Sequence, residues 1–262
     1  MELLPIVSPL LRSGDDLASI IALAGVRPGD IIVVSSKALA TVEGAMIDLR
    51  SITPSKEAHT WTERCGGSPA FRQAVLDEVR RLHGRVLPGC PQAMLTELKP
   101  EGLPSGVILA ANAGLDESNA PEGHAIGWPK DPVKSVMKLR TNLEFTIQTS
   151  KPANQQTSKP LLAIILSDST CRPRRIGVTA QALTVSGIEP VQSLIGEKDL
   201  YGKNLRMTQE AVADQLATAA NIVMGNEMQS IPAVIIRDHG IGLSDYEGWV
   251  PGIEAKEDLF HV

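Results

Sequence analysis

Short apolar runs alternate with amphipathic stretches along the chain, and the runs predict buried strands. Each run is aliphatic or β-branched and only a few residues long, as expected for a strand covered on both faces. The predicted strands are Ile31–Val34, Gly106–Ala111, Leu161–Leu166 and Pro232–Arg237. Polar residues follow the second and third runs directly, in the segments Asn112–Asn119 and Ser167–Ser169.

Helix start and stop signals separate these runs. Helices are predicted over Asp15–Ala24, from Ser68-Pro69 to about His83, from Asp131-Pro132 onward, and over an apolar stripe that Thr208 caps and Gly225 ends. Because the helices and strands mix without a strict βαβ alternation, we predict an α+β fold. It should have mixed and antiparallel sheets with flanking helices, and not a doubly wound sheet.

One polar segment interrupts this pattern at residues 148–160. It contains prolines and a short repeat, Thr149-Ser150-Lys151-Pro152 and then Thr157-Ser158-Lys159-Pro160. Such a composition predicts an exposed, mobile loop and no repeat architecture. We therefore expect residues 1–262 to form a single domain that carries this loop.

Charge and composition exclude two classes of partner. The net charge is −5 and aromatic residues make up 3% of the chain, which argues against both a basic surface and a stacking platform for nucleic acid. No apolar run approaches the roughly 18 residues of a membrane span.

The cysteines Cys65, Cys90 and Cys171 are far apart and form no CxxC pair, which suits a reducing compartment. We expect a soluble cytoplasmic protein.

Two carboxylates carry the candidate chemistry. Asp116 and Asp168 each lie in a polar turn after an apolar run, beside hydroxyl and amide side chains. Oxygen ligands of this kind suit Mg²⁺ or Mn²⁺. The alternative is that both residues form ordinary Asx turns. The turn after Asp168 also holds Arg172, Arg174 and Arg175, which could bind an anionic substrate or form a solvated basic turn.

The sequence lacks the motifs of several common enzyme classes. It has no GxxxxGK[ST], no GxGxxG after a strand, no HExxH and no GxSxG. A P-loop ATPase, a Rossmann dinucleotide site, a zinc hydrolase and an α/β-hydrolase are therefore unsupported.

Nine segments in one order resemble a known family. They are Pro9–Leu17, Val33–Lys37, Glu43-Gly44, Ile52–Ser55, Ala111–Asn119, Ser167–Pro173, Gly196–Gly202, Ala211–Asp214 and Val223–Gly225. Together the segments resemble the F420-0:gamma-glutamyl ligases, which are GTP-dependent enzymes that add L-glutamate to the side chain of coenzyme F420. This resemblance implies a two-lobed α+β protomer in an intertwined homodimer.

The resemblance also implies a division of labour among residues. The positions that match ligands of two Mg²⁺ or Mn²⁺ ions are Asp116, Asp168, Ser169 and either Asn226 or Glu227. The positions that match nucleotide contacts are Pro9, Leu10, Leu11, Ser36, Lys37, Asn119, Met224 and Gly225.

The chemistry implied by the resemblance is amide formation through an acyl phosphate. The γ-phosphoryl group of GTP would activate a carboxylate of the acceptor, the glutamate amine would attack it, and GDP and phosphate would leave. Arg172 or Arg175 would hold the acceptor's phosphate or the incoming glutamate.

The chain departs from the family pattern near Lys37. Thr41 occupies the position where family members usually carry a lysine. Thr170-Cys171 and Ile176 also differ from the usual residues. Two alternatives therefore stand beside the F420-0 ligase: the same chemistry on a folate or pterin acceptor, and an inactive homologue that binds nucleotide and metal.

Overall fold

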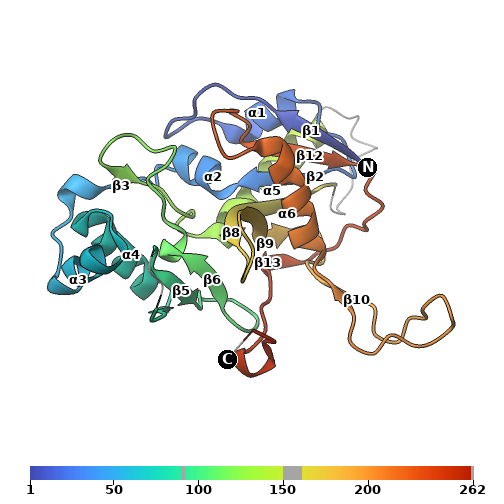
Figure 1. Ribbon diagram of the computed structural model, residues 1–262. Helices are drawn as coiled ribbons and strands as arrows, with labels where there is room; N and C mark the ends of the chain where they lie inside the picture. The colour runs from blue at the N-terminus through green and yellow to red at the C-terminus, as the bar shows by residue number, and fades with distance from the viewer. Residues whose placement is uncertain (90–91, 150–160, 261–262) are drawn as a thin grey trace.

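A six-stranded mixed sheet forms the centre of the molecule (Figure 1). The computed structural model describes residues 1–89, 92–149 and 161–260. The sheet order is β1-β12-β2-β8-β9-β13, and only the β2–β8 pairing within it is parallel. The strand bounds are β1 Glu2–Ile6, β2 Ile31–Ser35, β8 Ala163–Cys171, β9 Val178–Ser186, β12 Ala233–Arg237 and β13 Glu247–Trp249.

Alternating side chains of the central strands enter two separate cores. In β2, Ile32 and Val34 pack into one core while Ile31 and Val33 pack into the other, because successive strand residues point to opposite faces. Helix α6, Val212–Met224, covers the second face. Helices α1, Leu17–Leu23, and α5, Pro132–Thr149, cover the first. Burial on both faces explains why these strands read as continuous apolar runs.

A second group of elements packs beside the central sheet and shares its first core. Figure 1 shows α3, α4, β5 and β6 together at one side, and β10 at the base of a projecting arm. The remaining helices and short helical turns are α2 Ser36–Val42, α3 Lys56–Cys65, α4 Pro69–Arg81, η1 Leu49–Ser51, η2 Asn112–Gly114 and η4 Ala255–Glu257. The remaining strands are β3 Ile47–Asp48, β4 Arg85–Val86, β5 Leu95–Leu98, β6 Ile108–Ala111, β7 His124–Ala125, β10 Gln192–Ser193 and β11 Gln209–Glu210.

These elements confirm the predicted α+β class with a mixed sheet. Ser68 caps α4 as predicted, with its hydroxyl accepting from the Phe71 N–H at 3.1 Å. No helix within the described ranges is both long and apolar enough to span a membrane. Cys65 and Cys171 are not in disulfides, and Cys90 lies outside the described residues.

Three sequence predictions need correction. Ala211, not Thr208, is the N-cap of α6, because Gln209–Glu210 first pairs with β10 as strand β11. The strand predicted over Leu161–Leu166 continues to Cys171, because β9 pairs with it along that length. The predicted loop begins too early, since α5 continues to Thr149. The rest of that loop, residues 150–160, lies outside the described residues.

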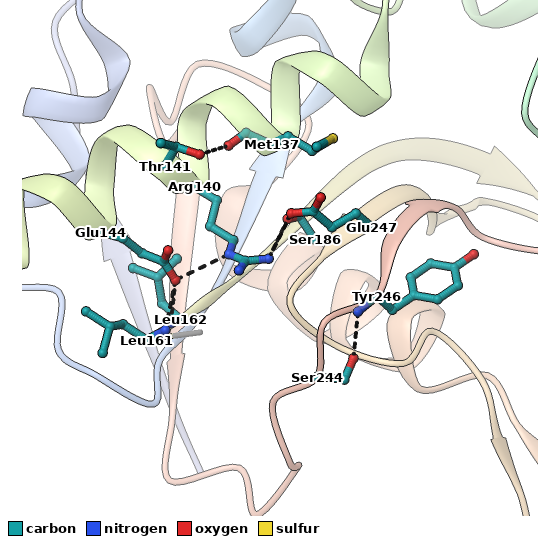
Figure 2. Close-up of polar contacts among 10 residues, drawn as sticks. All are labelled: Met137, Arg140, Thr141, Glu144, Leu161, Leu162, Ser186, Ser244, Tyr246 and Glu247. Atoms are coloured by element: carbon teal, nitrogen blue, oxygen red, sulfur yellow. Dashed lines mark hydrogen bonds and ion pairs between the residues drawn. The ribbon is translucent and has the colours of Figure 1, made fainter. Parts of the chain in front are cut away.

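Arg140, whose side chain is 12% exposed, links α5 to the central sheet (Figure 2). Its Nη1 donates to Ser186 Oγ at 2.8 Å and to Glu247 Oε1 at 3.1 Å. Its Nε donates to Glu144 Oε1 at 3.3 Å, and the same oxygen accepts from the Leu161 N–H at 2.8 Å. The guanidinium thus joins α5 to β9 and β13, and Glu144 joins α5 to Leu161, just before β8.

Candidate active site

The sheet topology gathers several predicted site segments at one edge. Strands β1, β2 and β8 run in the same direction, so their carboxyl ends share the edge where β12 begins. Ser35 pairs with Ser167 at that edge, and Ser36 and Asp168 come next in the two strands' sequences. The Ser8 N–H donates to Ser230 O at 3.0 Å, which brings the segment after β1 to the loop after α6.

Asp168 is held by two donors from other elements. Its Oδ1 accepts from Ser36 Oγ at 3.0 Å, and its Oδ2 accepts from Trp128 Nε1 at 2.7 Å. Burial raises the pKa of Asp168 above its ordinary value, and the Trp128 and Ser36 hydrogen bonds and the charge of Lys37 only partly oppose this. Burial of the ionised Asp168 carboxylate therefore lowers the stability of the folded protein.

A strained turn carries Asp116 to the same place. Asn112, Ala113 and Gly114 have φ values of 51°, 53° and 77°, all in the left-handed region. Arg72 is buried and stabilises the turn by donating from Nη1 to Asn112 Oδ1 at 2.8 Å. A left-handed conformation at Asn112 and Ala113, which are not glycine, costs free energy. Contacts with the surrounding structure must therefore hold the turn in this conformation.

Asp116 is fixed through both its backbone and its side chain. It exchanges two backbone hydrogen bonds with Ile126, each of 2.9 Å. Its Oδ2 accepts from Lys37 Nζ at 2.5 Å, and its Oδ1 accepts from the Ser118 N–H at 2.9 Å. Burial would raise the pKa of Asp116, but the hydrogen bonds from Lys37 and Ser118 outweigh it and hold the pKa below its ordinary value.

Lys37 and Ser36 link the two carboxylates. They are the first residues of α2, and Lys37 bonds Asp116 while Ser36 bonds Asp168. The ammonium of Lys37 also donates to Ser118 Oγ at 3.1 Å, and its charge acts on Asp168. Four predicted site residues therefore form one contact network, in which Lys37 bonds one carboxylate and its charge acts on the other.

Ser169 lies on the opposite side of β8 from Asp168, as strand alternation requires. Its Oγ donates to Asn226 Oδ1 at 3.3 Å. Of the two candidates in the segment after α6, Asn226 is therefore the one bonded to Ser169. The backbone N–H of Glu227 instead donates to Gln229 Oε1 at 2.9 Å.

The two arginines with predicted substrate roles lie farther along the β8–β9 hairpin. Arg172 and Arg175 are exposed and close its turn, with the Arg175 N–H donating to Arg172 O at 3.2 Å. Arg172 is four residues beyond Asp168, which corresponds to roughly 13 Å along a strand. Its charge acts on Asp214 of α6.

The remaining predicted nucleotide contacts differ in their exposure. Pro9 and Leu10 are exposed, Leu11 is half-buried, and Asn119 is exposed with φ 56°. Met224 is buried at the end of α6, and Gly225 ends that helix with φ 68°. Only Ser36 and Lys37 of this set directly contact the two carboxylates in the described part of the chain.

Sequence reasoning missed Trp128, Arg72 and Ser118. Trp128 belongs to the turn Gly127-Trp128-Pro129, and only 3% of its surface is exposed. A buried indole N–H needs an acceptor, so a tryptophan in such a turn was a usable signal. The acceptor itself, Asp168, is 40 residues away and could not be read from the pattern.

The donor set fits a hard divalent cation. No group of three or more His, Cys, Asp or Glu side chains that suits a metal occurs in residues 1–89, 92–149 and 161–260. Asp116 and Asp168 instead offer two carboxylates, while Ser169 and Asn226, on the other side of β8, offer a hydroxyl and an amide oxygen. Mg²⁺ is commonly held by one or two carboxylates, with water and substrate phosphates completing its shell. The two carboxylates meet that requirement.

Comparisons with known proteins agree with the sequence resemblance. A family model described as F420-0:Gamma-glutamyl ligase matches residues 5–238. The coenzyme F420:L-glutamate ligase of Methanothermobacter thermautotrophicus is 36% identical over 257 residues, which is 96% of this chain and 94% of that protein. The enzyme of the same name from Methanocaldococcus jannaschii is 35% identical over 262 residues, or 99% and 96%. That from Methanopyrus kandleri is 36% identical over 239 residues, or 91% and 86%. The chain therefore belongs to the F420-0:gamma-glutamyl ligase family, and it is a ligase.

Proposed function

We propose that this chain joins L-glutamate to a carboxylate of coenzyme F420-0, with GTP and a divalent cation, through an acyl-phosphate intermediate. The observation that carries the proposal is the pair Asp116 and Asp168, which accept hydrogen bonds from the adjacent residues Lys37 and Ser36. Trp128 donates a further hydrogen bond to Asp168. The names of the relatives supply the substrates F420 and L-glutamate.

The proposed reaction is limited by the poor electrophilicity of a carboxylate. Transfer of the γ-phosphoryl group to the acceptor carboxylate replaces an oxide with a good leaving group. The glutamate amine then attacks the carbonyl carbon, the carbon–oxygen bond to phosphate breaks, and an amide, GDP and phosphate result. In such transfers a protein mainly positions the reactants and stabilises charge.

Two Mg²⁺ or Mn²⁺ ions would be held by Asp116, Asp168, Ser169 and either Asn226 or Glu227. When bound, the cation would neutralise phosphate charge during transfer. Lys37 would contribute a further positive charge toward the nucleotide, in place of its present bond to Asp116. Thr41 cannot supply another, because its hydroxyl is neutral, and it is buried in α2 where it donates to Lys37 O at 2.7 Å.

Other segments would bind the nucleotide and the acceptor. Ser8–Leu11, Asn119 and the end of α6 would contact the nucleotide. Arg172 or Arg175 would bind the acceptor's phosphate or glutamate, in a homodimer of this chain.

A substrate panel tests the proposal. The purified chain is incubated with GTP or ATP, Mg²⁺ or Mn²⁺, L-glutamate, and F420-0, dihydrofolate or folate. We expect GDP and phosphate only when glutamate and F420-0 are both present, together with a mass gain of one glutamyl unit. A mass gain on a folate instead would establish the second acceptor class, and nucleotide binding with no turnover on any acceptor would identify an inactive homologue.

A further inference from the structure

Trp128 contacts three separate parts of the site region. Its Nε1–H donates to Asp168 Oδ2 at 2.7 Å. Its ring lies 6.2 Å from that of Trp249 on β13, centroid to centroid, with the planes tilted by 56°. Its nitrogen edge lies against Gly114 of the turn that leads to Asp116. Trp128 therefore contacts both Asp168 and the turn that leads to Asp116.

Gly114 makes the close approach possible. A Cβ at this position would lie 2.5 Å from Trp128 Nε1, nearer than non-bonded atoms tolerate, and φ at Gly114 is +77°. Only glycine satisfies both conditions without displacing the indole. The turn of Asp116 and the donor of Asp168 are thus packed directly against each other.

The segment Ile126–Trp128 joins the two carboxylates along the chain as well. Ile126 holds the backbone of Asp116 in a two-bond bridge, and two residues later Trp128 holds the side chain of Asp168. A short segment with both contacts sets how far apart Asp116 and Asp168 can lie.

The chemistry of indole suits this task. Its N–H donates and has no lone pair available to accept, so Trp128 can orient a carboxylate without becoming a cation ligand itself. A carboxylate has about four lone-pair positions, and Trp128 and Ser36 occupy one on each oxygen of Asp168. The Ser169 N–H takes a third, so capacity for a cation remains.

We propose that Trp128 is a positioning residue, which through its indole N–H fixes the orientation of Asp168 relative to Asp116 for a divalent cation. This inference rests on the proposed metal dependence. A merely structural Trp128 would fill the core and stack near Trp249, and a ring without the N–H would then serve equally well.

The test measures binding of Mn²⁺ alone to the full chain, by the electron paramagnetic resonance signal of free Mn²⁺. The variants are Trp128→Phe and a chain with benzothienylalanine at position 128, in which sulfur replaces the N–H while the ring shape is kept. Trp61→Phe is the matched control, because Trp61 lies on α3 against Arg64. Thermal melting checks that each variant is folded.

We expect both variants at position 128 to bind Mn²⁺ roughly 10–100-fold more weakly, as loss of outer hydrogen bonds to metal ligands generally does. Trp61→Phe should bind like the wild type. Wild-type affinity in the benzothienyl variant, or equal weakening in Trp61→Phe, would overturn the inference and leave the metal site standing. A wild-type chain that binds no Mn²⁺ would overturn both the inference and the proposed metal dependence.

Discussion

Two polar clusters lie beside β8 and β9, and each combines two carboxylates with one cationic side chain. The Arg140 cluster comprises Arg140, Glu144, Ser186 and Glu247 (Figure 2). The Asp168 cluster comprises Ser36, Lys37, Asp116, Trp128 and Asp168. Their charges are the same in kind and number, so charge alone does not tell a structural cluster from a site.

Saturation of the acceptors does tell them apart. Glu144 Oε1 accepts from Arg140 Nε, from the Leu161 N–H and from the Leu162 N–H, so that oxygen is fully used. Each oxygen of Asp168 accepts from only one side chain of another element. An oxygen with three donors anchors the fold, whereas the oxygens of Asp168, each with one side-chain donor, retain capacity for a ligand.

The largest expected effect is on stability and comes from a substitution that breaks the Arg140 cluster. Arg140→Met should lower the free energy of unfolding by about 3 kcal/mol, because it leaves Glu144, whose side chain is 18% exposed, without its cation. Denaturant unfolding measures this loss. Arg50→Met is the control, since Arg50 forms an exposed pair with Asp48 and its removal should change stability little. Equal stability of the Arg140 variant and wild type would show that the cluster does not anchor α5.

The next largest effect is on activity and comes from a substitution that breaks the Asp168 cluster without unfolding the chain. Asp168→Asn should lower glutamate-dependent phosphate release by roughly 100-fold or more, because it removes a charge that the proposed reaction uses. Its melting temperature should not fall, since a neutral amide avoids the burial of a charge. Asp77→Asn, at an exposed carboxylate on α4, provides the comparison. Full activity in Asp168→Asn would remove this residue from the mechanism.

A smaller effect tests the spacing between the two carboxylates. Gly114→Ala places a Cβ against Trp128 and should weaken Mn²⁺ binding roughly tenfold. Gly25→Ala has a nearly equal backbone requirement, with φ +79°, but its Cβ would meet nothing within 4 Å. The two variants share the conformational penalty and differ in the clash. Similar Mn²⁺ affinities in both would mean that the Trp128 contact is irrelevant to binding.

The smallest effect concerns pH. Burial raises the pKa of Asp168 above its ordinary 3.8, so the folded protein binds this proton more tightly than the unfolded chain does. As pH rises from about 3.8 to the raised pKa, the unfolded chain loses the proton first, and the free energy of unfolding falls. The fall is about 1.4 kcal/mol for each pH unit of that window.

Unfolding of wild type and Asp168→Asn across this pH range isolates the contribution. The stability of the wild type relative to the variant should decrease as pH rises through the window and stay constant above it. Parallel pH profiles would show that Asp168 titrates equally in both states.

Much of the fold follows from local sequence. The β-branched run Ile31–Val34 became a strand, and the Ser68-Pro69 signal began a helix, because propensity and capping act over a few residues. The end of β8 did not follow, because its last residues are polar and only pairing with β9 makes them a strand. Thr208 was misread for a similar reason, since the β10–β11 pairing precedes the helix.

The sequence by itself determined which residue types are present for the chemistry: Asp116, Asp168, Ser36 and Lys37 stand in recognisable segments. Only the tertiary structure decided that these four form one network, and that Trp128 and Arg72 support it. The hydrogen bonds concerned join residues 132, 79 and 40 positions apart. Local propensity acts over a few residues, so contacts at such separations exist only after the sheet has brought the strand ends together.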